Sequence, residues 1–201
     1  MKKLNIGCEN EYRQGWVNLD INKKVKADIY HDLDKFPYPF NDNEFDIILA
    51  SHVLEHLDDI SKVMKELYRI SKDKGIIYLE VPHFSNPFAL SSQLDHKHMF
   101  SYITFGEWHC NKDLFPLFQV LKKKISFTRL NFPFLNKIFN PFINLFPLLY
   151  ERLFAFILPS STIVYILKVR KDKKFQANRM EYLKSMEAKY KIDNLDFIRK
   201  I

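Results

Sequence analysis

Short apolar runs rich in β-branched residues alternate with polar stretches along this chain, and their length is typical of buried strands. They span residues 3–8, 16–21, 27–30, 45–50, 75–81, 119–128 and 162–169. Between the fourth and fifth runs, residues 58–71 carry apolar side chains at helical spacing, with Asp58 as the expected N-cap. A strand, a helix and a strand in this order predict a right-handed parallel crossover.

We therefore expect an α/β fold with a Rossmann-like, mostly parallel sheet and an antiparallel C-terminal edge made by the last two runs. Only about eight residues, 9–16, separate the first two runs, which is too few for a crossover helix. Eight extended residues still reach roughly 26 Å, farther than the roughly 17 Å length of a five-residue strand. The first helix of the fold is therefore expected to be reduced to a turn.

A single domain is expected over residues 1–170, with insertions at about 83–116 and 129–160, followed by a basic helical C-terminal tail at 171–201. Insertions of this size in a compact domain usually serve function. The two cysteines, Cys8 and Cys110, lack the spacing of a disulfide or zinc framework. Because the first strand begins directly after Met1 with no apolar leader, we expect a cytoplasmic protein.

The net charge is +7, and where the charged residues lie along the chain is more informative about binding partners than the total. Residues 171–201 contain nine Lys/Arg against five Asp/Glu, so +4 of the total belongs to the tail. A broad basic surface of the kind that binds nucleic acid is therefore not indicated, and the sequence shows no RNA-binding module.

Ligand-type residues stand where the first three runs end. Gly7 ends the first run, where a backbone can turn tightly and approach a ligand. Asp20 ends the second run, where a carboxylate can accept both hydroxyl groups of a ribose. Asp32 and Leu33 follow the third run, where a carboxylate and a backbone N–H can bind the edge of an adenine. Because the C-terminal ends of parallel strands meet at one edge, these positions predict a nucleoside pocket.

The same segments resemble those of class I S-adenosylmethionine-dependent methyltransferases. The resemblance covers roughly residues 3–82 and rests on KLNIGC at 3–8, GWVNLD at 15–20, HDL at 31–33, FDII at 45–48 and SHVLEHL at 51–57. In two places the chain departs from the family pattern: Gly7-Cys8-Glu9 keeps one glycine of a usually glycine-rich loop, and Asn5 replaces a common acidic residue. A nicotinamide dinucleotide is not indicated, since GxGxxG is absent and Asp20 follows Gly7 too closely.

The resemblance implies that residues 1–170 are a methyltransferase-like domain with S-adenosyl-L-methionine as cofactor. Gly7 would lie beside the methionine part, Asp20 would bind the ribose, and Asp32 with Leu33 would hold the adenine. Residues 50–52 would close the site near the sulfonium, with His56 just behind. The predicted cofactor-binding residues are Gly7, Cys8, Asp20, Ile21, Asp32, Leu33, Ser51, His52 and His56.

Histidines in the first insertion are the candidate acceptor-side residues, because an imidazole can accept a proton near neutral pH. His83, His96 and His98 are the predicted catalytic residues, and their segments resemble those that line the acceptor side in small family members. Hydrogen-bonded loop histidines are the alternative. No metal is expected, although His96 and His98 with His83 or Asp95 could bind a divalent ion.

The chain contains nineteen phenylalanines, and many of them fall in the second insertion, at 132–158. The longest uncharged run there is about 13 residues, whereas a membrane-spanning helix needs about 20. The insertion could be a lid over the acceptor pocket, extra core or a dimer surface. It could also be an interfacial segment that contacts a membrane, together with Lys122–Lys124, Lys137 and the basic tail.

The sequence therefore predicts an S-adenosylmethionine-dependent methyltransferase acting on an oxygen or nitrogen atom of a small molecule. A sugar or lipid-linked glycan intermediate is the favoured acceptor class, at the inner face of the membrane if the apolar insertion binds there. An RNA methyltransferase and a non-catalytic binding or scaffold protein are the alternatives. No motif specifies the acceptor or the oligomeric state.

Overall fold

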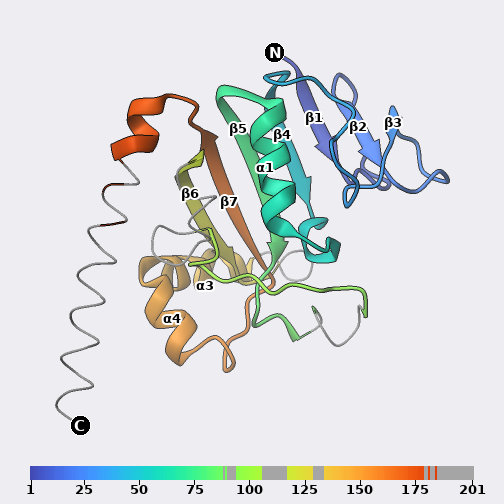
Figure 1. Cartoon of the computed structure of the whole chain (residues 1–201). Helices are drawn as coiled ribbons and strands as arrows, with labels where there is room; N and C mark the ends of the chain where they lie inside the picture. The colour runs from blue at the N-terminus through green and yellow to red at the C-terminus, as the bar shows by residue number, and fades with distance from the viewer. Residues whose placement is uncertain are drawn as a thin grey trace, which may run out of the picture.

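A computed structural model describes residues 1–87, 89, 94–105, 117–128, 134–178, 181 and 184 (Figure 1). The first half contains β1 (Lys3–Ile6), β2 (Val17–Asp20), β3 (Ile29–Tyr30), β4 (Phe45–Ser51), the 3-10 helix η1 (Leu54–His56), α1 (Ile60–Ile70) and β5 (Ser71–Pro82). The second half contains β6 (Phe118–Ser126), α3 (Leu135–Leu145), α4 (Pro147–Leu153) and β7 (Thr162–Val169).

The seven strands form one sheet in the order β3-β2-β1-β4-β5-β7-β6. Strands β1 to β5 run parallel, and β7 lies antiparallel between β5 and β6. This arrangement confirms the predicted Rossmann-like sheet with an antiparallel C-terminal edge. Residues 7–16 contain turns and no helix, yet β2 pairs parallel with β1, as the reach of a short loop predicts.

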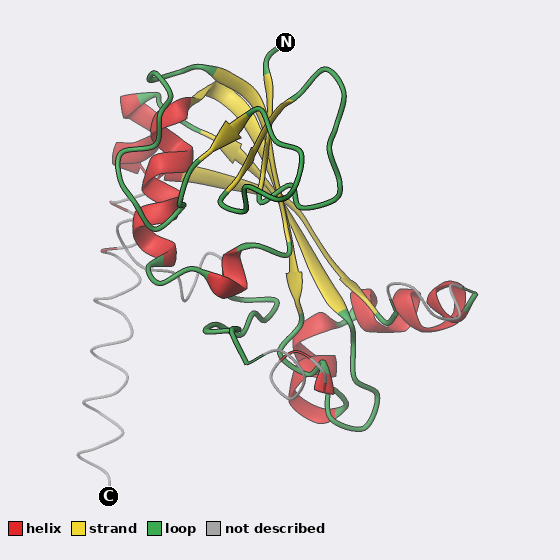
Figure 2. Cartoon of the chain, turned by 90° about the vertical axis from the view of Figure 1, so that its right-hand side faces the viewer, coloured by secondary structure: helices red, strands yellow, loops and turns green. Residues whose placement is uncertain are grey.

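The hydrophobic core lies between the sheet and α1. Leu4 and Ile48, on adjacent strands, are fully buried. Met64 and Leu67 of α1 are also fully buried, and Figure 2 shows this helix lying along one face of the sheet. Complete burial of each such side chain contributes about 1.5–3 kcal/mol, so this packing holds β1 and β4 in place.

Helix α1 begins one residue later than predicted. Its N-cap is Asp59, whose carboxylate accepts a hydrogen bond from the backbone N–H of Lys62. Asp58 was the wrong choice: its carboxylate accepts instead from Lys97 Nζ, and its N–H donates to Asp34. A cap must face the N–H groups of the first turn, and only the second of these two aspartates does so.

Among the described strands, β6 pairs only with β7, so its outer edge has no strand partner. Three asparagines of α3 form hydrogen bonds to backbone groups at and just beyond the C-terminal end of this edge. Asn136, Asn140 and Asn144 stand four residues apart, and so on one side of the helix. Their side chains bond the backbone of Thr128, Phe127 and Ile125, respectively. Asn144 both accepts from the Ile125 N–H and donates to its C=O. The second insertion thus satisfies backbone groups at the C-terminal end of this edge, at Ile125, and in the two residues that follow β6, Phe127 and Thr128.

The described start of the C-terminal tail is helical at 173–178, and the tail contacts α1 and the beginning of β5. Gln176 Nε2 donates to the Tyr68 hydroxyl, and the Lys171 N–H donates to Asp73. The apolar positions predicted for the rest of the tail, Met180, Leu183, Met186 and Tyr190, lie outside the described residues. So do Cys110 and His109.

We expect Asn144→Ala to lower the free energy of unfolding by about 1–2 kcal/mol, because two backbone groups of Ile125 lose their partner. Urea denaturation followed by circular dichroism measures the change. Lys137→Ala on the same helix is the control, since Lys137 is exposed, and it should change stability little. Equal effects of the two substitutions would show that the asparagine side chains do not hold the edge.

Candidate functional site

The C-terminal ends of β1, β2 and β4 surround two adjoining hollows. In Figure 1 these three strands point downward, so their C-terminal ends are the lower ones. The hollows have volumes of about 230 and 310 Å³, and they share Gly7, Glu9, His52 and His56. This is the edge at which open α/β sheets bind ligands.

All nine predicted cofactor-binding residues line one hollow or the other. Gly7, Cys8, Ser51, His52 and His56 line the first, and Gly7, Asp20, Ile21, Asp32, Leu33, His52 and His56 line the second. Asn5, Glu9, Glu11, His31, Asp34, Val53, Glu55, Leu57 and Asp95 complete the linings and were not predicted as cofactor-binding residues. The structure thus brings together residues that lie as far apart in the sequence as Gly7 and Asp95, which line the same hollow.

Gly7 has to be a glycine in this fold. Its φ of +62° is disfavoured for other residues, and a Cβ at this position would lie 2.6 Å from Val53 Cγ2. The backbone after β1 therefore passes directly over the start of η1. Next to it, the Cys8 N–H donates to the C=O of Leu19, which joins the ends of β1 and β2.

Cys8 and Asp20 are held in fixed positions at the ends of these strands. Burial raises the pKa of the Cys8 thiol, so the side chain is a neutral apolar part of the wall. The Asp20 carboxylate is 4% exposed and accepts the backbone N–H groups of Glu9 and Asn22, at 2.7 and 2.8 Å. Because a carboxylate oxygen can accept more than one hydrogen bond, Asp20 keeps capacity toward the hollow.

A buried hydrogen-bond network replaces the missing first helix. Asn5 Nδ2 donates to the Asn18 side chain and to the Glu11 C=O. The backbone N–H and the side-chain amide of Asn18 both donate to Asp28, which holds the pKa of that carboxyl below its usual range. The hydroxyl of Tyr12 donates to the other oxygen of Asp28. Loop 7–16 is thus anchored at its middle, and Asn5 has a structural role there.

The wall opposite the Asp20 side consists of β4's end and η1. His52 adopts a φ of +54°, and its backbone N–H donates to the C=O of Glu80. Its Nδ1 lies 3.1 Å from Glu55 Oε1. Glu55 is fully buried, although it belongs to an otherwise apolar stretch. A buried carboxylate facing a hollow was not predicted from the sequence. The feature that could have indicated it is the acidic residue at position 55, inside the mostly apolar stretch Val53–Leu57.

The structure separates the three predicted catalytic histidines. His83 is fully buried away from both hollows, with Nδ1 2.8 Å from Ser85 Oγ and Nε2 3.0 Å from Glu151. His98 Nε2 lies 2.8 Å from the C=O of Leu57. Only His96 reaches the wall, where its ring packs edge-to-face on His56 with centroids 4.6 Å apart. His83 and His98 instead attach the insertions to the rest of the fold.

The second insertion does not cover the hollows. Of its described residues, 134–160, none belongs to either lining. Figure 2 shows α3 and α4 extending away from the sheet at the end where the hollows lie. The described part of the insertion is therefore no lid over these two hollows, and the predicted lid over the acceptor pocket stays a prediction.

We expect Gly7→Ala to destabilise the protein by about 2–4 kcal/mol, through backbone strain and the collision with Val53. Gly15→Ala is the matched control: its φ is +77°, but a Cβ there meets no atom within 4 Å, so the cost should stay at about 1–2 kcal/mol. Chemical denaturation measures both. If the two substitutions cost the same, Val53 does not constrain Gly7.

Comparisons with known proteins agree with this geometry. Residues 11–79 match a family model described as a methyltransferase domain. A search of curated proteins found no match. Among solved structures, an S-adenosylmethionine-dependent methyltransferase from Mesorhizobium loti aligns with a TM-score of 0.55 and 13% identity, covering 83% of this chain and 90% of that one.

Two further solved structures show the same fold. A SAM-dependent methyltransferase from Archaeoglobus fulgidus aligns with a TM-score of 0.55 and 18% identity, over 83% of this chain and 85% of that one. A chain in the complex between a methyltransferase and its Trm112 activator from Haloferax volcanii aligns with a TM-score of 0.56 and 15% identity, over 84% and 82%. The family match over residues 11–79 and the shared fold confirm the predicted resemblance to class I methyltransferases, a family whose cofactor is S-adenosylmethionine.

Proposed function

We propose that this protein transfers the methyl group of S-adenosylmethionine to an oxygen or nitrogen atom of a small molecule. The observation that carries the proposal is the pair of hollows at the ends of β1, β2 and β4, lined by all nine residues predicted to bind the cofactor. A non-catalytic relative of the family would not need to keep these residues around an open space.

In this proposal Asp20 accepts hydrogen bonds from the ribose hydroxyls, and the backbone N–H groups of Glu9 and Asn22 orient its carboxylate. Asp32 and Leu33 lie in the same hollow and hold the adenine. Gly7 lets the methionine part approach the backbone. Ser51 and His52, in the adjoining hollow, face the sulfonium.

The linings of the two hollows favour a cationic cofactor. They contain seven carboxylates, Glu9, Glu11, Asp20, Asp32, Asp34, Glu55 and Asp95, and no lysine or arginine among the described residues. The sulfonium of S-adenosylmethionine is positively charged, and the product that leaves is not. A negative site therefore binds the substrate form of the cofactor in preference to the product.

Methyl transfer is an in-line displacement, so the main task of the protein is to align acceptor and methyl group and to exclude water. A hydroxyl or amine acceptor must also lose a proton. Of the three predicted catalytic histidines, His96 is the one beside the hollows, through its contact with His56. We place the acceptor at this wall.

Calorimetric titration with S-adenosylmethionine tests the function. The wild-type chain should bind it, and Asp20→Ala should weaken binding by about 10-fold or more, the effect of losing hydrogen bonds to a charged group. Asp42→Ala, an exposed aspartate paired with Arg69 on the outside of the domain, is the control and should bind as tightly as the wild type. Absence of binding at millimolar cofactor would favour the non-catalytic alternative.

We also propose that α3 and α4 rest on an anionic membrane. Large apolar side chains are exposed along residues 134–157, which contain α3, α4 and the turn after them. They include Phe142 at 75%, Phe156 at 83% and Ile157 at 79%. Further exposed members are Phe134, Ile138, Leu145, Phe146, Leu148, Leu149, Leu153 and Phe154. An apolar surface of this extent on one segment is unusual for a water-exposed face. Among the described residues, no helix is long and apolar enough to cross a bilayer.

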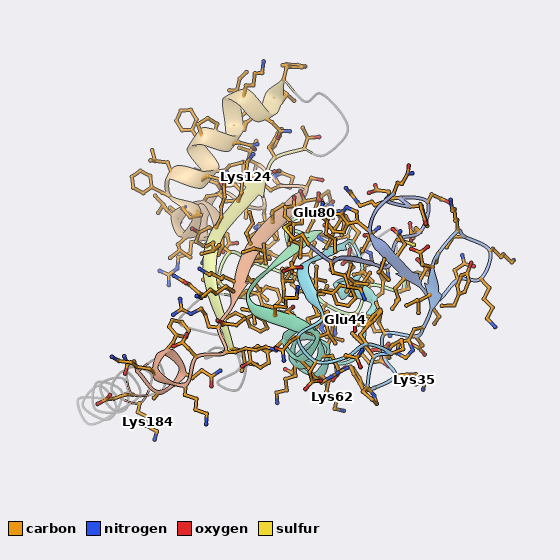
Figure 3. The ribbon with its side chains drawn as sticks, turned by 90° about the horizontal axis from the view of Figure 1, so that it is seen from above. Lys35, Glu44, Lys62, Glu80, Lys124 and Lys184 are labelled. Carbon is orange, nitrogen blue, oxygen red and sulfur yellow. The ribbon has the colours of Figure 1, made fainter. Side chains whose placement is uncertain are left out.

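Lysines beside this apolar segment favour an anionic surface as the partner. A groove of about 450 Å³ between β6 and α3 is lined by Lys122, Lys123, Lys124 and Lys137, with asparagines and Pro141 but no acidic residue. Figure 3 shows Lys124 on β6 beside α3. Apolar side chains flanked by lysines are the pattern of segments that lie in the interface of anionic membranes.

The position of the segment connects the membrane to the acceptor. Ser126 and Thr162, which bracket the insertion, pair with each other, and Thr162 pairs with Pro82 at the C-terminal end of β5. The insertion therefore leaves the sheet at the same end as the hollows. A lipid-linked glycan, whose lipid stays in the bilayer, is the acceptor class that this placement favours.

Sedimentation with phosphatidylglycerol vesicles tests the membrane contact. The protein should sediment at low salt. The single substitutions Phe142→Ser and Phe156→Ser should each weaken vesicle binding by about 10-fold or more, since a buried phenylalanine contributes about 1.5–3 kcal/mol. Leu94→Ser is the control, because Leu94 is 97% exposed on the other insertion. Failure to sediment, or a dimer that both phenylalanine substitutions dissociate, would contradict the proposal.

A further inference from the structure

We propose that Glu55, His56 and His96 bind a divalent transition-metal ion at the wall of the hollows. Glu55 and His56 come from η1, and His96 comes from the first insertion, 40 residues later. One ligand atom from each of the three lies within 4.8 Å of the other two. Ligands of one ion at about 2.1 Å are separated by up to about 4.2 Å, so small side-chain rotations would complete the site.

Glu55 provides the first independent sign of a missing cation. Its side chain is fully buried, and Oε2 has no hydrogen-bond partner among the described residues. Its other oxygen, Oε1, lies 3.1 Å from His52 Nδ1. An unsatisfied oxygen of a buried carboxylate is costly, and such groups are usually paired or coordinate a metal.

The two histidines show the same deficit. His56 Nδ1 and His96 Nδ1 are both buried atoms without a hydrogen bond in the described part of the chain. Asp95 Oδ2 lies 2.9 Å from His56 Nδ1, outside hydrogen-bond geometry, and the Asp95 side chain is 72% exposed. Asp95 therefore lies beside His56 on the open side, and it is not one of the three clustered ligands.

The donor set indicates the type of ion. Two imidazole nitrogens and a carboxylate, with an open position for water or substrate, are typical of zinc, manganese, iron and cobalt sites. Calcium and magnesium prefer ligand sets made of oxygen atoms alone. We therefore expect a first-row transition ion.

Groups outside the cluster hold its members in place. The Lys97 N–H donates to the backbone C=O of Glu55, which fixes the first insertion against η1. The Lys97 ammonium is turned away to Asp58, at 2.6 Å, so it does not oppose a cation at the cluster. His52, on the outer side of Glu55, orients the carboxylate, as second-sphere partners of metal ligands do.

This site differs from the one that sequence spacing allowed. His98 Nε2 is engaged with the C=O of Leu57, and His83 is bonded to Ser85 and Glu151 elsewhere in the fold. Among the residues that the sequence analysis considered as metal ligands, His96 is the one that belongs to the cluster. Glu55 and His56 take the places of the remaining candidates. Glu55 and His56 are adjacent residues of η1, and each has a ligand atom within 4.8 Å of one from His96.

The role of the ion rests on the proposed function. An acceptor hydroxyl bound to the ion would lose its proton to water more readily, because a metal ion lowers the pKa of a bound oxygen. The oxygen lone pair then forms the new bond to the methyl carbon. The carbon–sulfur bond breaks with its electron pair on sulfur, which yields the methyl ether and S-adenosylhomocysteine.

Calorimetric titration of the full chain, treated with a chelator and then dialysed, tests the site with Zn²⁺ and Mn²⁺. Co²⁺ absorption spectra report on the ligands independently of catalysis. We expect one ion per chain, with binding weakened by at least about 10-fold in both Glu55→Gln and His96→Gln. Glu55→Gln preserves shape, and circular dichroism verifies that each variant is folded. His98→Gln, in the same insertion, is the matched control: the glutamine amide can still donate to the Leu57 C=O, so the insertion stays attached and the variant should bind the ion as the wild type does.

S-adenosylmethionine binding, measured on the same preparations, separates this inference from the proposed function. Cofactor binding without stoichiometric metal binding would overturn the metal site and leave the function standing. Metal binding at these residues without cofactor binding would support the site and contradict the function. If His98→Gln weakens metal binding as much as His96→Gln does, the ion lies elsewhere and the assignment is wrong.

Discussion

The parallel pairing of β1 with both β2 and β4 is the constraint on which the rest of this structure depends. Leu4 pairs with Val17 on one side and with Ile48 on the other, so three strands end at the same edge. Their buried apolar side chains hold this register, because a shift of one residue would turn them to the opposite face. Seven of the nine predicted cofactor residues lie at those strand ends or within five residues beyond them, and the other two, Asp32 and Leu33, follow β3.

A chain with only four glycines and no first helix must stabilise that edge by other means. Gly7 lets the backbone pass close to the Val53 side chain. The buried side-chain amides of Asn5 and Asn18 form a hydrogen bond at the place where the first helix of such a fold normally packs. The cost of burying these amides is offset because each is bonded within the loop. The low glycine content therefore does not prevent the formation of a cofactor-sized hollow.

Local patterns predicted much of this. Strand runs, the parallel order and the antiparallel edge follow from hydrophobic periodicity and connection length, and Asp20 and Asp32 were found because parallel strands end together. The burial of Glu55 could not be predicted, since it depends on residues 94–98 folding back over η1. The same holds for His83, which follows a strand end as Asp32 does, but is covered by Glu151 from an insertion 68 residues away.

The second insertion illustrates the same limit. Its phenylalanines are visible in the sequence, but the spacing of Asn136, Asn140 and Asn144 acquires meaning only once their partner strand β6 is known. These hydrogen bonds hold the asparagine side of α3 against the end of β6 and leave the apolar side of the helix exposed. A lid over the hollows and an exposed face have the same composition, so only the tertiary contacts distinguish them.

A crystal structure of the full chain with S-adenosylhomocysteine would test the central claim most directly. The account predicts the ribose hydroxyls at the Asp20 carboxylate, the adenine between Asp32 and Leu33, and the sulfur directed toward His52 and the Glu55–His56–His96 wall. A ligand bound elsewhere, or bound in the hollows without contact to Asp20, would contradict it.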